Sequence, residues 1–264
     1  VVPMVARSLS LAAGLSDLAV MGVTFWFALI SIAVLSSRAH AFLPSFYQGF
    51  LKLADRHRVT LMGGDTSRAR REIFIDVLVV GWVKAGREIL RSGARAGDHV
   101  FVTGAIGKAA LGLDLLRRGK SPLTGIERQA VASHRSPTPR TEAGIRLCDT
   151  RMAASMIDIS DGLSTDLNHL CEESAAGARI YENRLPLPDV GHSRRMLKFA
   201  LTGGEDYELL FTVRANKVAQ LAAEIGGVPV TEIGRIVSRS KGVSIVRANG
   251  AVEPLTPAGW DHFR

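Results

Sequence analysis

The sequence predicts an α/β or α+β protein with two domains. Segments with the patterns of strands and of helices alternate along the whole chain, and no internal repeat is visible. The chain has 264 residues, which suits two domains of modest size. A polar and basic stretch that contains glycine runs from Lys84 to Asp98. Such a stretch is typical of a domain boundary, and we expect an N-terminal domain at residues 1–87 and a C-terminal domain at residues 88–264.

The first strongly apolar segment runs from Leu18 to Ser37 and carries no charge. It is long enough to cross a lipid bilayer as a helix. However, it contains Gly22 and Thr24, is rich in β-branched and aromatic residues, and has no marked excess of Lys and Arg at either end. A buried strand has the same pattern, and we predict a strand here rather than a membrane span.

Three further elements are predicted in the N-terminal domain. A helix is expected over residues 40–57, where Pro44 is tolerable in the first turn and four apolar residues recur at helical spacing, namely Phe42, Phe46, Phe50 and Ala54. Residues 59–62 are typical of a strand that ends in a glycine turn at residues 63–66. Residues 72–83 form a long apolar segment with the composition of a strand.

The C-terminal domain is predicted to mix strands and helices to its end. Strands are expected at residues 99–103, 152–157, near Arg179, and at residues 207–213, 228–236 and 243–246. Helices are expected at residues 107–118, 164–174 and 215–225. A connection punctuated by proline lies at residues 136–139.

The chain contains 33 Lys and Arg against 25 Asp and Glu, which gives a formal net charge of +8. The basic residues are dispersed, and no aromatic residues are interleaved with them as on an RNA-binding sheet. This pattern permits an enzyme that handles phosphates, and we expect neither nucleic acid nor a membrane as a partner. The two cysteines, Cys148 and Cys171, are too few for a disulfide framework or a cysteine-rich zinc site. We therefore expect a reducing compartment, the cytoplasm.

Four short motifs place carboxylates beside small residues at predicted strand ends or helix starts: Ser16-Asp17, Gly63-Gly64-Asp65-Thr66, Asp158-Ile159-Ser160-Asp161-Gly162 and Gly203-Gly204-Glu205-Asp206. Glycine allows the backbone to approach a ligand closely, and carboxylates can hold Mg²⁺, which also takes oxygens from substrate phosphates and water. Each motif alone is more typical of a helix cap or a turn. Together with Arg91 in a glycine-containing loop, they indicate a metal and phosphate site assembled from distant segments.

Six motifs follow one another along the chain: SDLAVMG at residues 16–22, GGDT at 63–66, RSGA at 91–94 with Gly97-Asp98, DISDGL at 158–163, GGEDYELL at 203–210 and GWDHF at 259–263. They occur in the order found in the thiamine-monophosphate kinase family, which the chain resembles from about Leu11 to Phe263. This family belongs to the superfamily that also contains aminoimidazole ribonucleotide synthetase. The resemblance implies the two-domain fold of that superfamily, a homodimer in which the N-terminal sheets pair, and a site in the cleft between the domains.

The resemblance also implies a role for each matched position. Mg²⁺ would be held by Asp17, Asp65, Asp158 and Asp161. ATP would contact Tyr47, Gly64, Asp65, Arg91 and Ser160. Thiamine phosphate would contact Glu205, Trp260 and Phe263, and catalysis would rest on Asp65, Arg91 and Asp158. The three aromatic residues could instead pack in a core, although aromatic faces also suit stacking on a flat heterocycle.

The implied reaction is the ATP-dependent phosphorylation of thiamine phosphate to thiamine diphosphate. The acceptor is itself a phosphate whose second ionisation lies near pKa ~6, so direct in-line transfer assisted by Mg²⁺ needs no general base. Family members begin with a further segment that contains GDDAA-type and TTD…VHF motifs, which this sequence lacks. Two alternatives therefore stay open: a catalytically incompetent fragment that binds nucleotide or dimerises, and another ATP-dependent enzyme of the same superfamily.

Overall fold

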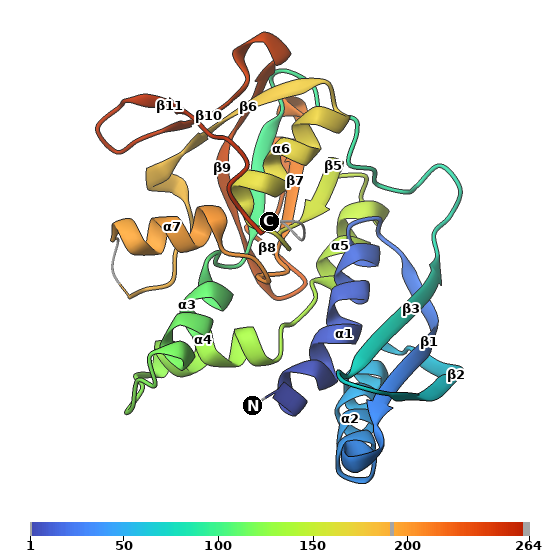
Figure 1. Ribbon diagram of the computed structural model, residues 1–264. Coiled ribbons are helices and arrows are strands. Elements are labelled where there is room, and N and C mark those ends of the chain that lie inside the picture. The colour runs from blue at the N-terminus through green and yellow to red at the C-terminus, as the bar shows by residue number, and fades with distance from the viewer. Residues whose placement is uncertain (1, 191–192, 261–264) are drawn as a thin grey trace.

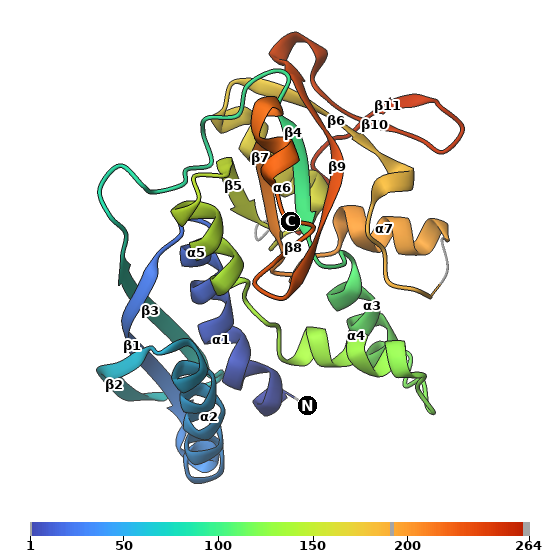
Figure 2. The same cartoon turned by 180° about the vertical axis from the view of Figure 1, so that it is seen from behind.

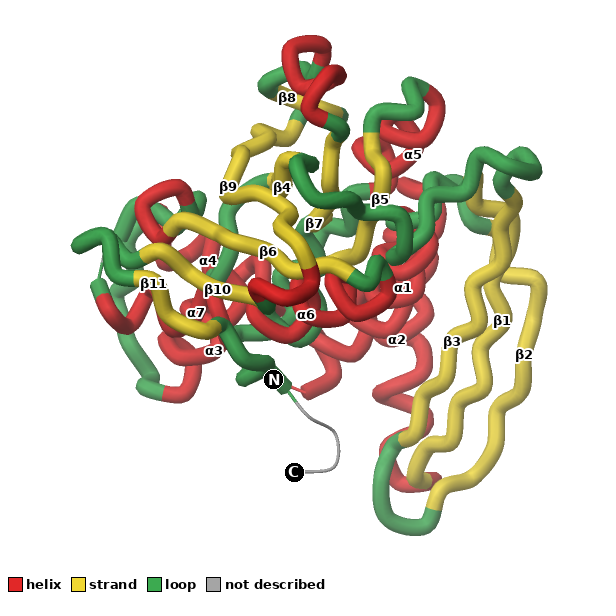
Figure 3. Tube along the Cα trace, turned by 90° about the horizontal axis from the view of Figure 1, so that it is seen from above, coloured by secondary structure: helices red, strands yellow, loops and turns green. Residues whose placement is uncertain are grey.

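The computed structural model describes residues 2–190 and 193–260 and begins with two helices on a three-stranded sheet (Figure 1). The helices are α1 (Val2–Ala19) and α2 (Ser36–His57), and the strands lie in the order β2 (Thr60–Ala69), β1 (Thr24–Leu35) and β3 (Phe74–Trp82). The central strand β1 is parallel to β2 and antiparallel to β3. Both helices pack on one face of this sheet, and the opposite face is uncovered in the described part of the chain (Figure 3).

Strand β1 confirms the strand predicted within the uncharged segment. Its alternate residues Ala28, Ile30, Ile32 and Val34 are buried against the two helices, as the two-residue period of a strand requires. No helix in the described ranges is both long enough and apolar enough to span a bilayer. The apolar character of the segment is therefore explained by its central position in the sheet.

Helix α2 confirms the predicted helix, because Phe42, Phe46 and Phe50 are buried along one face. Its start was predicted wrongly. Strand β1 passes into α2 at Ser36 without a linker, so Pro44 lies inside the helix rather than in its first turn.

The predicted glycine turn at residues 63–66 is also wrong, because β2 continues through these residues to Ala69. Gly64 pairs with Ile30 of β1, and a Cβ atom at Gly64 would lie 1.8 Å from the Ile30 carbonyl oxygen. Glycine is therefore needed for a close approach of two strands rather than for a turn. This places Asp65 within an edge strand, on the side of the sheet away from the helices, where it lies opposite Ser31.

The uncovered face of the N-terminal sheet carries large apolar side chains. The pairing of β1 with β3 places Leu29, Phe74, Leu78 and Trp82 on this face, and all four are exposed. Isolated exposed apolar residues are common on protein surfaces, but a contiguous group of them indicates an interaction surface. We refer to these four residues as the outer sheet face.

The second sheet follows the order β11 (Val252–Pro254), β10 (Val243–Val246), β6 (Ala176–Tyr181), β9 (Val228–Ser238), β4 (His99–Thr103), β7 (Leu209–Val213) and β5 (Ala153–Asp158), and β8 (Glu224–Ile225) pairs with β9. In Figure 1 helix α6 (Leu163–Glu173) lies in front of these strands, and Figure 2 shows the opposite face. Val100 and Val102 of β4 pack in the core that includes α6. Phe101 packs on the opposite face with Leu147 of α5 (Thr141–Asp149).

Several helices of the structure were not predicted: α1, α4 (Gly125–Arg135), α5 and α7 (Arg194–Thr202). Helix α3 (Lys108–Arg117), by contrast, lies where a helix was predicted. The helix predicted at residues 215–225 is wrong, because only a 3₁₀ helix, η2 (Ala215–Gln220), forms there. Gly226 and Gly227 have positive φ angles and turn the chain so that Ile225 pairs with Val228 in a short hairpin.

Candidate functional site

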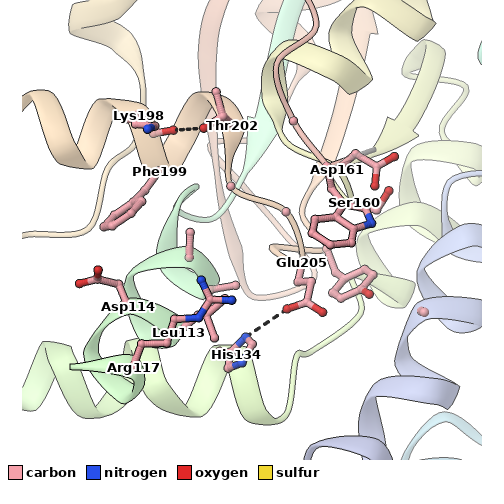
Figure 4. A pocket seen from close by; sticks show the side chains of 18 of the residues that line it. Leu113, Asp114, Arg117, His134, Ser160, Asp161, Lys198, Phe199, Thr202 and Glu205 are labelled. Atoms are coloured by element: carbon pink, nitrogen blue, oxygen red, sulfur yellow. Dashed lines mark hydrogen bonds and ion pairs between the residues drawn. The ribbon is translucent and has the colours of Figure 1, made fainter. Parts of the chain in front are cut away.

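A cavity of about 790 Å³ lies between the last turn of α1, helices α3, α4 and α7, and the loops that follow β5 and α7. Its lining includes five of the residues singled out from the sequence, which are Asp17, Ser160, Asp161, Glu205 and Trp260. Figure 4 shows its polar and apolar side chains. The structure thus brings together residues that are separated by up to 243 positions (260 − 17) in the sequence.

One end of the cavity is acidic. Asp17 lies in the last turn of α1, Asp158 ends β5, and Asp161 follows in the loop before α6. The hydroxyl of Ser16 donates a hydrogen bond of 2.6 Å to Asp158 Oδ2. Because Asp17 is at the end of a helix, the expectation of a helix start or strand end was wrong for this residue.

The pKa of the Asp158 carboxyl group is raised to about 6, chiefly by burial and also by the negative charge of Asp17, whereas Ser16 and Arg91 act in the opposite direction. Burial also raises the pKa of Asp17, with Asp161 adding to the effect and Arg91 opposing it. The carboxyl groups are therefore close enough to repel one another, and Arg91 is the cation that offsets this repulsion.

The acidic end has the chemistry of a magnesium site. Mg²⁺ prefers oxygen donors and takes one or two protein carboxylates together with water and substrate phosphates. In residues 2–190 and 193–260, no group of three or more His, Cys, Asp or Glu residues is arranged to hold a metal by itself. Asp17 and Asp161 line the cavity and Asp158 lies near Asp17, so these carboxylates could supply one or two oxygens to an ion that is completed by water and phosphate oxygens.

Asp166 supports this end of the cavity, and the sequence reasoning missed it. Its Oδ2 atom accepts hydrogen bonds from the backbone N–H groups of Asp161 and Gly162, which fixes the loop that carries Asp161. Its pKa is raised to about 8, chiefly by burial and also by the charges of Asp161 and Asp158. The available signal was an acidic residue in the first turn of α6, where it can bind free N–H groups.

Farther into the cavity, Glu205 faces His134 of α4, with 3.1 Å between Glu205 Oε2 and His134 Nδ1 (Figure 4). Apolar side chains of Leu113 and Phe199 also line the cavity, together with the charged side chains of Asp114, Arg117 and Lys198. The backbone N–H of Trp260 donates to the carbonyl oxygen of Asp161, which holds the C-terminal segment against the site. Phe263 lies outside the described residues.

Comparisons with known proteins agree with this arrangement. Residues 8–83 match the family described as AIR synthase related protein, N-terminal domain, and residues 95–247 match the corresponding C-terminal domain. The thiamine-monophosphate kinase of Bacillus subtilis (strain 168) is 35% identical over 97% of this chain and 80% of its own length. The chain belongs to the thiamine-monophosphate kinase family. The protein of the same name from Escherichia coli (strain K12) is 37% identical over 96% of this chain and 78% of its own length.

A solved structure of the thiamine-monophosphate kinase family also confirms the predicted fold. AaThiL complexed with AMPPCP and TMP is 31% identical and superposes with a TM-score of 0.86, covering 100% of this chain and 82% of that one. The α/β fold of the aminoimidazole ribonucleotide synthetase type is therefore established for this chain.

Some residues that the family resemblance singled out lie away from the acidic end. Asp65 and Gly64 belong to β2, and the charges that shift the pKa values of Asp17 and Asp158 do not include Asp65. Tyr47 packs edge-on against Phe46, with ring centroids 5.4 Å apart. The described chain thus brings Asp17, Asp161 and Glu205 to one cavity and leaves these three residues in the N-terminal layer.

The GGEDYELL motif of the thiamine-monophosphate kinase family also has a structural part that the sequence reasoning missed. The carboxylate of Asp206 accepts hydrogen bonds from the backbone N–H groups of Gly107 and Ala109, so it caps α3, which lines the cavity. Glu208 binds Arg140 through two hydrogen bonds. Of the carboxylates in this motif, only Glu205 lines the cavity.

Proposed function

We propose that this chain catalyses the ATP-dependent phosphorylation of thiamine phosphate to thiamine diphosphate. The observation that carries the proposal is one cavity with carboxylates at one end and Glu205 farther in, with the apolar side chains of Leu113 and Phe199 in its lining. The first end suits Mg²⁺ and phosphate groups, and the second suits a cationic heterocycle. The relatives at 35% and 37% identity carry the name of this activity.

In this proposal the carboxylates of Asp17, Asp65, Asp158 and Asp161 hold Mg²⁺. ATP contacts Tyr47, Gly64, Asp65, Arg91 and Ser160, and thiamine phosphate contacts Glu205, Trp260 and Phe263. The assignments of Tyr47, Gly64, Asp65 and Phe263 rest on the family resemblance, whereas the cavity supports those of Asp17, Ser160, Asp161, Glu205 and Trp260. Asp158 and Arg91 are supported by their mutual charge interaction.

Chemistry at this site depends on positioning and charge. Bound Mg²⁺ supplies neutralisation of phosphate charge. Arg91 adds a positive charge beside Asp17 and Asp158, where the negative oxygens of two phosphates must approach each other. The acceptor phosphate is already largely ionised at neutral pH, since its second pKa is about 6. Catalysis by Asp65, Arg91 and Asp158 therefore consists of orienting the two substrates for in-line transfer, without a proton-abstracting residue.

Incubation of the purified chain with ATP, Mg²⁺ and thiamine phosphate tests the function directly. We expect thiamine diphosphate and ADP to form in equal amounts, and addition of excess EDTA to stop the reaction. ATP binding without product would instead support an incompetent nucleotide-binding fragment. Product formed from another phosphate acceptor, but not from thiamine phosphate, would support a different enzyme of the superfamily.

We also propose that the enzyme is cytoplasmic and acts on small anions, without a nucleic-acid or membrane partner.

We also propose a homodimer that forms through the outer sheet face. Its support is the group of exposed apolar side chains, Leu29, Phe74, Leu78 and Trp82, on a sheet whose other face is filled by α1 and α2. Burial of such a face against a second copy removes apolar area from water at roughly 25 cal/mol per Å².

Leu78→Glu should convert the dimer to a monomer, because it places a charge at the centre of the outer sheet face. Analytical ultracentrifugation measures the change. Leu51→Glu is the matched control, since Leu51 is also exposed but lies on α2, and this variant should stay dimeric. A Leu78→Glu variant with the wild-type mass in solution would contradict the proposed interface.

A further inference from the structure

His134 and Glu205 form a contact that the residue roles given above do not use. His134 lies in the last turn of α4, and its side chain is 12% exposed, whereas the Glu205 side chain is 37% exposed. Both residues line the cavity. Figure 4 shows the carboxylate directed toward the imidazole, and of the two side chains that of Glu205 is the more exposed.

The imidazole holds the carboxylate because each group lacks a competing partner. His134 Nδ1 is buried and makes no hydrogen bond of good geometry, and Glu205 Oε2 is the ion-pair partner, 3.1 Å away. A buried polar nitrogen strongly favours any acceptor within reach.

Glu205 needs such an anchor for its carboxylate only, because its backbone N–H already donates a hydrogen bond of 2.8 Å to the carbonyl oxygen of Ser160. It follows Gly203 and Gly204 in the loop after α7 and has a φ angle of +69°, in a region that residues with a side chain rarely adopt. In the described part of the chain, His134 is the ion-pair partner of its carboxylate. With Oε2 directed to His134, Oε1 is left to accept a hydrogen bond from a ligand.

The structure of thiamine phosphate indicates which of its groups would bind Glu205 Oε1. This step rests on the proposed function. The phosphate of thiamine phosphate must lie at the acidic end, near Asp17 and Asp161, to receive a phosphoryl group. The thiazolium and aminopyrimidine rings then extend into the cavity toward Glu205 and the apolar side chains of Leu113 and Phe199. The pyrimidine ring carries an exocyclic amino group, which is a hydrogen-bond donor that matches a carboxylate oxygen.

We propose that His134 is a positioning residue, which orients Glu205 so that its free carboxylate oxygen binds the amino group of the pyrimidine ring. His134 thereby determines specificity for the acceptor without touching it. Its loss leaves Glu205 in place but lets the carboxylate rotate, so affinity for thiamine phosphate falls while the nucleotide end of the site is unchanged.

The test is calorimetric titration of the full chain with thiamine phosphate in the presence of Mg²⁺. His134→Leu should raise the Kd for thiamine phosphate about tenfold, the effect of losing one well-placed hydrogen bond to a charged group. The Kd for ATP and the thermal midpoint should stay near their wild-type values. His134→Asn keeps an N–H donor near the position of Nδ1 and should recover most of the affinity.

A matched control exists elsewhere in the chain. His99 Nδ1 lies 3.2 Å from Glu232 Oε2, and both side chains are similarly part-buried, but neither lines the cavity. His99→Leu should therefore leave the Kd for thiamine phosphate unchanged. If both histidine variants weaken binding equally, the effect is a general loss of stability and the proposal is wrong.

A substrate analogue gives a second readout that a purely structural role would not change. Oxythiamine phosphate has an oxo group in place of the amino group, so it presents an acceptor to Glu205. The wild-type chain should bind thiamine phosphate at least about tenfold more tightly than this analogue, and His134→Leu should bring the two Kd values together. An unchanged ratio in His134→Leu overturns the positioning role alone. A wild-type chain that binds no thiamine phosphate overturns the proposed function and this inference with it.

Discussion

Asp158→Asn should lower kcat for thiamine diphosphate formation by on the order of a thousandfold and leave the fold intact. Asparagine matches the shape of aspartate and can still accept the hydrogen bond from Ser16 Oγ. It lacks the negative charge, however, and the proposed Mg²⁺ ion would lose its buried ligand between Asp17 and Asp161. The rate is measured as thiamine diphosphate formed per unit time at saturating ATP and Mg²⁺.

The free energy of unfolding of Asp158→Asn, unlike its kcat, should not decrease. Because burial raises the pKa of Asp158 from 3.8 to about 6, the folded chain binds a proton more tightly than the unfolded chain between about pH 4 and pH 6. The free energy of unfolding of the metal-free wild type should therefore decrease as the pH rises through this window. Asp158→Asn removes this decrease, so at pH 7 it should be as stable as the wild type or more stable, by up to about 3 kcal/mol. Urea unfolding in EDTA at pH 5 and pH 7 measures the difference.

Asp149→Asn is the matched control for Asp158→Asn. Asp149 is exposed at the end of α5, and its replacement should change neither kcat nor the pH dependence of stability. Wild-type turnover in Asp158→Asn would contradict the assignment of the acidic end as the metal site. A lost activity that is accompanied by a lower unfolding free energy would indicate a structural role instead.

Arg140→Met should lower the free energy of unfolding by about 3–5 kcal/mol. Arg140 donates to Glu208 through Nε at 2.7 Å and through a terminal nitrogen at 2.5 Å. Glu208 is 2% exposed and also accepts a hydrogen bond from Thr103 Oγ1. Without Arg140, the buried Glu208 carboxylate has no compensating positive charge. An unpaired buried charge costs far more free energy than the loss of an exposed ion pair. Urea denaturation followed by circular dichroism measures the change.

Two further variants separate the buried charge from general packing. Arg140→Met combined with Glu208→Gln removes the charge that was left unpaired and should recover more than half of the lost stability. Arg146→Met breaks an exposed pair with Glu142, in which both side chains are more than 60% exposed, and should cost at most about 1 kcal/mol. Equal losses in Arg140→Met and Arg146→Met would show that burial of the Glu208 pair has no special energetic role.

The elements that could be predicted from the sequence are those whose apolar residues recur at the spacing of a helix or a strand along the whole element. Strand β4 occupies the predicted residues 99–103, and α2 buries the predicted phenylalanines. Helices such as α4 and α7 were missed because much of their surface is polar or basic, and each contributes only a few buried apolar residues, such as Val131 and Met196, to a small core. The failed turn at Gly64 has a similar cause, since the sequence does not show which strand approaches a glycine.

The site was predictable to the extent that motifs with recognisable chemistry converge. Asp17, Asp161 and Glu205 were each singled out from local patterns, and the fold brings them to one cavity. His134 was not found, because a single histidine in the last turn of a helix gives no local signal of a carboxylate 71 positions away (205 − 134). Asp206 and Glu208 lie in a motif that resembles a binding site, yet they bind other parts of the protein, the Ala109 N–H and Arg140. The motif alone does not distinguish such residues from those that line the cavity.

The hydrogen bond from Ser16 to Asp158 has a consequence for the order of folding. It joins residues 142 positions apart, and its two ends belong to α1 on the N-terminal sheet and to β5 of the C-terminal sheet. Contacts between such distant segments form only after a large loss of chain entropy. Neither half of the chain alone contains both Asp17 and Asp158, so tight binding of the proposed Mg²⁺ ion would report that the two halves have docked. A slow rise in Mg²⁺ affinity during refolding would time that docking step separately from formation of either sheet.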